Sequence, residues 1–126
     1  MRKYSSIEIE LINIQIGCLL RLARLRKGLS QLDLGHQIDS NSMLVGRIER
    51  GKGKSSWEKI FMLSKQMDTN FCELFELRSK DDLLLIVEEA LQYENKLTKD
   101  KREFYDSLKR KIEETYSSFN QEQNSN

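Results

Sequence analysis

The chain has 126 residues, 38% hydrophobic and 33% charged, with a net charge of +1 from 21 Lys and Arg against 20 Asp and Glu. This length is sufficient for one domain, or for one small domain with an appendage. No apolar run reaches the roughly 18 residues of a membrane span, and no secretory signal pattern follows the basic start. We therefore expect a cytoplasmic protein with no membrane partner.

The chain contains no proline, and its richness in Leu, Lys and Glu favours an all-α fold. Cys18 and Cys72 both have apolar neighbours, so we interpret them as reduced core thiols, with a disulfide or a reactive thiol as the alternative. His36 is the single histidine, too few for ordinary zinc sites or catalytic triads, and we interpret it as a surface or helix-packing residue. We therefore predict no enzyme, no metal site and no cofactor.

Seven segments have helical apolar spacing or begin with a capping residue. Their predicted ranges are 9–27, 31–38, 42–50, 57–67, 70–77, 82–97 and 100–119. Gly28 and Gly51 are predicted to end the first and third helices. The alternation over 7–11 leaves a short strand there as an alternative, residues 1–6 are expected to fray, and residues 120–126 to be disordered.

Residues 30–51 predict two short helices joined by about three residues. The inward apolar positions are Leu34, Ile38, Val45 and Ile48. The second helix turns Ser42, Met43, Gly46, Arg47 and Arg50 outward. This arrangement is a helix-turn-helix, in which the second helix can lie in the major groove of DNA.

Over roughly residues 12–77 the sequence resembles the lambda-repressor-like family, the Cro/CI or XRE type of helix-turn-helix regulator. The matching features are Arg24, Gly28-Leu29-Ser30-Gln31, Leu34, Ile48-Glu49-Arg50-Gly51-Lys52, the helix from Trp57 to Leu63, and Phe71-Cys72-Glu73-Leu74-Phe75. The sequence departs from the family pattern at Gly35, where Ala is usual, at Gly46, and at Ser55 in place of a common proline. The resemblance implies a five-helix DNA-binding head, in which Trp57 is interpreted as a packing residue.

The predicted DNA-contacting residues are Gln31, Asn41, Ser42, Met43, Leu44, Gly46, Arg47, Arg50, Lys52 and Lys54. The resemblance places Ser42, Met43 and Arg47 at base-reading positions and implies a structural ion pair between Arg24 and Glu49. The fork of Arg47 suits guanine, with a phosphate contact as the alternative.

For the remaining contacts two interpretations stay open. Gln31 is expected at a phosphate or as a helix-start residue, and Asn41 as a helix cap with a phosphate contact. Leu44 is expected at a thymine methyl or in the core, and Lys52 and Lys54 at phosphates or in solvent.

Charge is distributed unevenly along the chain. Residues 21–54 hold eight basic and three acidic residues, a net charge of +5, and residues 77–126 hold nine basic and eleven acidic residues, a net charge of −2. A basic segment of this size supplies salt-dependent attraction to phosphates. The whole-chain charge therefore does not exclude a nucleic-acid partner.

The last two predicted helices are too apolar for a solvated tail, so we predict an α-helical hairpin over 79–119 that pairs with a second copy, after a head over 1–78. The predicted dimerisation residues are Leu83, Leu84, Ile86, Val87, Leu91, Phe104, Tyr105, Leu108, Ile112 and Tyr116. A hairpin folded back on its own head is the alternative.

The sequence thus predicts a regulator that binds double-stranded DNA sequence-specifically as a homodimer on a two-fold symmetric operator. Repression is favoured over activation by the resemblance. The alternative function is an antitoxin-like module whose C-terminal helices bind a partner protein.

Overall fold

The computed structural model describes residues 4–53 and 55–125. These residues form α1 (Ser6–Arg26), α2 (Gln31–Gln37), α3 (Ser42–Glu49), α4 (Trp57–Gln66), the 3-10 helix η1 (Cys72–Phe75), α5 (Lys80–Gln92) and α6 (Lys99–Asn124), with no strand among them. The predicted all-α class is confirmed. Within the described residues no helix is long and apolar enough to cross a membrane.

Each α-helix begins at a polar side chain that accepts a hydrogen bond from a backbone N–H of the first turn, which satisfies a group with no intrahelical partner. These caps are Ser5, Ser30, Asn41, Ser56, Ser79 and Thr98. Ser30 and Asp33 form a reciprocal capping box. Gly28 and Gly51 follow the ends of α1 and α3 with φ of 70° and 64°, a conformation that glycine adopts without steric cost.

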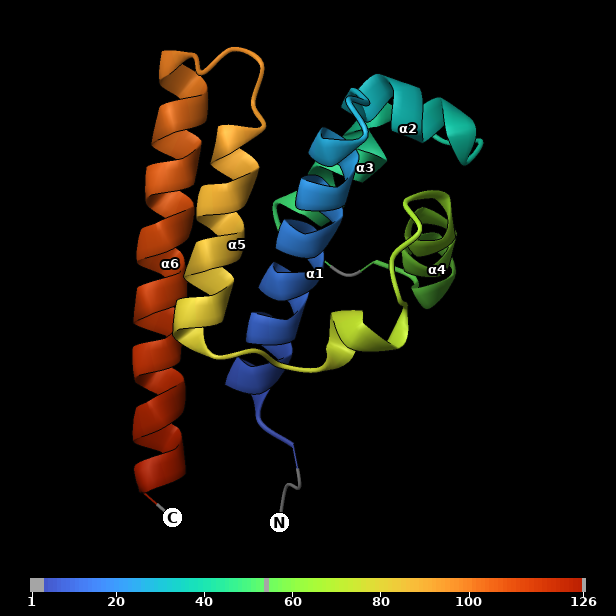
Figure 1. The fold of residues 1–126 in the computed structure, drawn as a ribbon. Coiled ribbons are helices and arrows are strands. Elements are labelled where there is room, and N and C mark those ends of the chain that lie inside the picture. The colour runs from blue at the N-terminus through green and yellow to red at the C-terminus, as the bar shows by residue number, and fades with distance from the viewer. Residues whose placement is uncertain (1–3, 54, 126) are drawn as a thin grey trace.

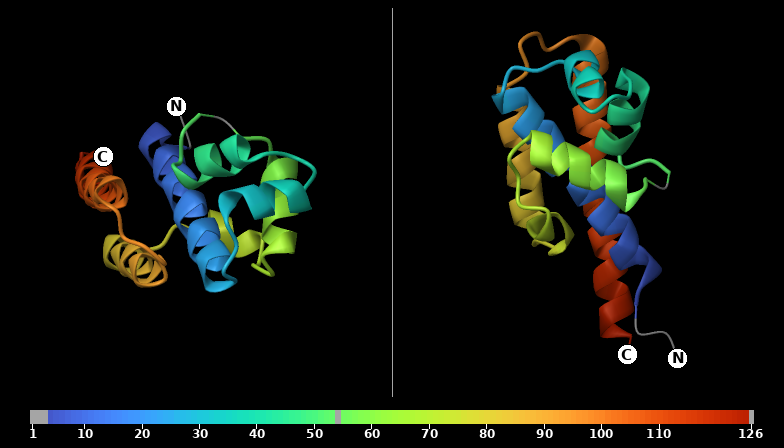
Figure 2. Two further views of the ribbon diagram at one scale, coloured as in Figure 1. Left: turned by 90° about the horizontal axis from the view of Figure 1, so that it is seen from above. Right: turned by 90° about the vertical axis from the view of Figure 1, so that its right-hand side faces the viewer.

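Helix α1 lies between the other helices, with α2, α3 and α4 on one side and α5 and α6 on the other (Figure 1; Figure 2, left). It contributes to two separate hydrophobic clusters. The head cluster contains Ile16, Leu20, Leu34, Ile38, Val45, Ile48, Ile60, Leu63, Met67 and Leu74. The hairpin cluster contains Leu11, Ile14, Cys18, Leu22, Leu83, Ile86, Val87, Ala90, Tyr105, Leu108, Ile112 and Tyr116.

The hairpin cluster corrects the predicted dimer interface. The structure buries Leu83, Ile86, Val87, Tyr105, Leu108, Ile112 and Tyr116 against α1 of the same chain. Leu84, Leu91 and Phe104 are partly buried against the same cluster. The prediction that these residues face a second copy is therefore wrong. The reason is that α1 carries an apolar stripe on each of two faces, so that one helix covers both the head and the hairpin.

The segment between η1 and α5 is fastened to α1 by one buried amide. Gln15, with none of its surface exposed, donates to the carbonyl oxygens of Leu74 and Glu76 at 3.1 and 2.8 Å and accepts from the N–H of Arg78 at 2.9 Å. Tyr116 of α6 donates to the carbonyl oxygen of Arg78. These bonds hold the connection extended and so fix where the hairpin starts.

Several predicted boundaries differ from the structure. The strand alternative over 7–11 is wrong, because Ser5 caps α1 and the helix begins at Ser6. The predicted helix over 70–77 is only the four-residue η1, since the backbone that Gln15 binds turns extended at Glu76. The predicted disordered tail is wrong over 120–124, where α6 continues through Asn124 because no Gly or Pro interrupts it.

Trp57 and Cys72 are more exposed than predicted. Trp57, the first residue of α4, is 65% exposed and packs edge-on against Phe61, with ring centroids 6.5 Å apart. Cys72 is an exposed free thiol, whereas Cys18 is buried as predicted. Burial raises the pKa of the Cys18 thiol to about 12.

Candidate nucleic-acid interface

Helices α2 and α3 meet across a tight turn over residues 38–41. Asp39 has a φ of 54° within this turn, and Asn41 then caps α3 by accepting from the N–H of Leu44 at 2.9 Å. A Cβ on Gly35 would stand 2.5 Å from the carbonyl carbon of Asn41, so only glycine allows α2 to approach the turn this closely. The glycine at this position is therefore required by packing.

Helix α3 has one apolar and one polar face. Val45 and Ile48 are 1% and 4% exposed and belong to the head cluster. On the opposite face Met43 is 78% exposed, and Arg47 and Arg50 are exposed. The predicted inward positions of this helix are thus confirmed, as are the outward positions of Met43, Arg47 and Arg50, whereas Ser42 is partly buried and Gly46 is buried under neighbouring side chains.

A hollow of about 440 Å³ opens on the polar face of α3. It is lined by Gln31, Ser42, Met43, Gly46, Arg47 and Arg50. All six belong to the predicted DNA-contacting set, and the structure brings them together from the first residue of α2 and the whole length of α3. The hollow offers an exposed thioether, a hydroxyl and two guanidinium groups to a ligand.

The predicted ion pair between α1 and α3 is present. Arg24 donates to both carboxylate oxygens of Glu49, from Nε at 2.6 Å and from Nη2 at 3.0 Å, and the two residues are 6% and 2% exposed. Arg24 also donates to the carbonyl oxygen of Leu29 at 2.7 Å. Gln31 donates from Nε2 to Glu49 at 3.1 Å. Glu49 therefore orients both the end of α3 and the first side chain of α2.

The other predicted contact residues lie at the rim of this face. Asn41 is exposed and serves as the cap of α3, while Leu44 is partly buried against the head cluster. Lys52 is exposed in the segment after α3. Lys54 lies outside the described residues. The side chain of Arg47 extends toward that segment, with Cδ 3.8 Å from where a Cβ on Gly53 would stand.

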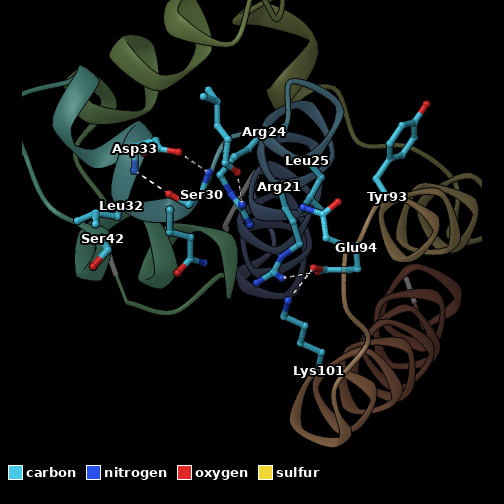
Figure 3. A pocket seen from close by; sticks show the side chains of 14 residues that line it. Arg21, Arg24, Leu25, Ser30, Leu32, Asp33, Ser42, Tyr93, Glu94 and Lys101 are labelled. Atoms are coloured by element: carbon cyan, nitrogen blue, oxygen red, sulfur yellow. Dashed lines mark hydrogen bonds and ion pairs between the residues drawn. The ribbon is translucent and has the colours of Figure 1, made fainter.

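A polar network that the sequence did not predict joins the hairpin to Glu49, and Figure 3 shows its Arg21, Glu94 and Lys101 side chains. Arg21 lies 3.5 Å from Glu49 and 3.7 Å from Glu94, and its guanidinium stands over the ring of Phe104 at 4.4 Å. Glu94 also accepts from Tyr105 at 2.5 Å and pairs with Lys101 at 3.3 Å. Burial is the main reason that the pKa of Tyr105 is raised, and the hydrogen bond to Glu94 raises this pKa further.

This network lines a second hollow of about 580 Å³ between the α5–α6 connection and the start of α2 (Figure 3). No sequence pattern could have revealed it, because Arg21 and Glu94 belong to different helical units and meet only through the tertiary fold. Its cations and carboxylates neutralise one another, so it links the hairpin to the head without forming an anion site.

In the described part of the chain, no group of three or more His, Cys, Asp or Glu side chains is placed to hold a metal ion. Comparison with family models, with curated proteins and with solved structures found no match to this chain.

Proposed function

We propose that this protein is a cytoplasmic, sequence-specific regulator that binds double-stranded DNA through α3, with a head of the lambda-repressor-like arrangement. The observation that carries the proposal is the two-faced α3. Its apolar face is fixed in the head cluster, and its opposite face exposes Met43, Arg47 and Arg50 around a hollow. An α-helix with its side chains is about 10–12 Å in diameter, so a helix such as α3 can enter a major groove about 12 Å wide.

Charge supports a DNA partner for this face. Residues 21–54 carry a net charge of +5, and part of that charge is used internally, because Arg24 is paired with Glu49. Arg47, Arg50 and Lys52 stay exposed around α3. Exposed cations that neutralise phosphates release counterions, and the affinity then falls steeply as salt rises.

The proposal includes a homodimer on a two-fold symmetric operator and, by the family resemblance, repression by occupying a promoter. The hairpin core cannot supply the dimer contact, because α1 already covers it. Outside the proposed DNA-binding face, α4 and η1 carry four exposed large apolar side chains: Trp57, Phe61, Met62 and Phe75. We assign the dimer contact to this aromatic surface, which begins directly after the segment that follows α3.

The antitoxin-like alternative is not carried further. It requires C-terminal helices with an apolar face free for a partner, and the apolar face of the hairpin is occupied by α1.

Selection of bound sequences from a random duplex library tests the proposal. We expect an enriched motif with two inverted half-sites whose centres are about 34 Å, one turn of DNA, apart. Binding to the enriched duplex should weaken steeply between about 50 and 200 mM salt. Failure to enrich any motif, or an interaction insensitive to salt, would reject the DNA-binding function, and a motif of one unpaired half-site would reject the homodimer alone.

A further inference from the structure

Three glycines lie inside helices, and their surroundings differ in kind. A Cβ on Gly17 would stand 2.6 Å from the carbonyl oxygen of Ile48, and one on Gly35 would stand 2.5 Å from the carbonyl carbon of Asn41. Backbone blocks a side chain at both positions. A Cβ on Gly46 would meet only side-chain ends, Arg50 Nη1 at 3.1 Å and Gln31 Oε1 at 3.3 Å. Gly46 therefore weakens α3 without any backbone approach to require it.

The space above Gly46 holds the ends of the Arg50 and Gln31 side chains, which both line the hollow on the polar face of α3. Arg50 stands one helical turn after Gly46 and turns its guanidinium back over the helix, toward the polar face. Arg47, by contrast, extends toward Gly53. Because Gly46 has no side chain, the guanidinium of Arg50 can lie directly over it on the exposed surface of α3.

The orientation of the Gln31 amide is determined by Glu49. A carboxylate only accepts hydrogen bonds, so the amide nitrogen of Gln31 must face Glu49, as it does at 3.1 Å. The amide oxygen is then left above Gly46. An outward amide oxygen accepts and cannot donate to a phosphate, which disfavours the phosphate contact predicted for this side chain. It suits the amino group of a base.

Resting on the proposed DNA-binding function, we propose that Arg50 and Gln31, seated together over Gly46, read one G·C base pair in the major groove. Guanine offers N7 and O6 as acceptors, and its paired cytosine offers the N4 amino group as a donor beside them. The guanidinium of Arg50 supplies two donors for guanine, and the amide oxygen of Gln31 accepts from cytosine. The pair of side chains therefore complements the whole edge of a G·C pair, which neither side chain does alone.

The test repeats the library selection with wild type, Arg50→Lys, Gln31→Met and Gly46→Ala. Arg50→Lys keeps the charge but loses the fork, Gln31→Met keeps the length but loses the acceptor, and Gly46→Ala pushes both groups aside. We expect all three variants to lose preference for G·C at the same position of the half-site. Loss of one bidentate contact corresponds to roughly a 5- to 100-fold fall in discrimination, with a smaller fall for Gly46→Ala.

Lys52→Ala is the matched control, because it removes an exposed cation beside α3 and should weaken all duplexes alike. Thermal unfolding of each variant checks the fold. If wild type selects a motif and the three variants change different positions, an A·T position or none, the base-reading inference is wrong while the DNA-binding function stands. If wild type selects no motif, both fail.

Discussion

The carboxylate of Glu49, at the last residue of α3, receives both Nε and Nη2 of Arg24 from α1, at 2.6 and 3.0 Å. The same carboxylate accepts from Gln31 and lies 3.5 Å from Arg21. One buried acidic group therefore connects α1, α2 and α3, and Arg24 depends on it for neutralisation, while Arg21 also pairs with Glu94.

We expect Glu49→Ala to lower the free energy of unfolding by about 3–5 kcal/mol, because it leaves Arg24 buried without its partner. Urea unfolding followed by circular dichroism measures the change. Arg26→Ala is the matched control, since the pair of Arg26 with Glu89 is about half exposed and its loss should cost no more than about 1 kcal/mol. Equal effects of the two substitutions would contradict the importance of burial at Glu49.

Deletion of residues 79–126 should destabilise the head, because it exposes the α1 side chains that the hairpin covers. These are Leu11, Ile14, Cys18 and Leu22, and exposing each of the larger ones costs about 1.5–3 kcal/mol. Light scattering should detect association of the truncated head beyond the proposed dimer, and its urea midpoint should fall. Deletion of residues 120–126 alone is the control and should leave both unchanged. A monomeric truncated head of full stability would show that the hairpin is not part of the core.

Arg47→Ala and Lys52→Ala should affect DNA binding in different ways. Arg47 lines the hollow on α3, so its loss should cost about 1–3 kcal/mol of discrimination between the selected site and a mismatched one. Lys52→Ala should weaken both duplexes to the same extent and lower the salt slope by about 1. Fluorescence anisotropy at several salt concentrations separates the two effects. A uniform loss for Arg47→Ala would assign Arg47 to a phosphate instead.

The two cysteines should differ in reactivity. At about pH 8 a thiol reagent should label Cys72 in the native protein and Cys18 only after unfolding, because Cys72 is exposed and burial raises the pKa of Cys18 to about 12. In the unfolded chain the Cys18 thiol ionises near the ordinary cysteine pKa of 9.0, so its contribution to stability is full below that pH. The contribution falls as pH rises from about 9 towards 12, and Cys18→Ala should remove this part of the pH dependence. Rapid native labelling of both thiols would contradict the buried placement.

The sequence predicted the head closely where local signals act. Ser30 and Asn41 cap helices as expected, and Gly28 and Gly51 adopt the positive φ of helix ends, whereas α4 is capped by Ser56 instead of Ser55. The apolar positions of α2 and α3 are buried as their spacing indicated. These features depend on residues a few positions apart, which a single sequence displays directly.

The errors at η1 and in the hairpin have one physical cause, contacts between residues far apart in the chain. Nothing near Gln15 indicates that its amide binds the backbone at Leu74, Glu76 and Arg78, so η1 was predicted as a longer helix. The hairpin residues were assigned to a second copy because covering them requires knowing that α1 is apolar on a second face. Trp57 was assigned to packing from its residue type, and only the tertiary arrangement shows it exposed.

Because α1 supplies side chains to both hydrophobic clusters, the boundary predicted between residues 78 and 79 separates no independent units. Substitutions in α5 or α6 that loosen the hairpin would expose the face of α1 that packs against it. Because α1 also packs against α3, the position of α3 would then be less well fixed. A genetic screen for lost regulation should therefore recover changes at Val87 or Ile112 alongside changes at Arg47. Thermal unfolding of the purified variants distinguishes the two groups, because variants at Val87 or Ile112 should unfold at a lower temperature than wild type and variants at Arg47 should keep the wild-type stability.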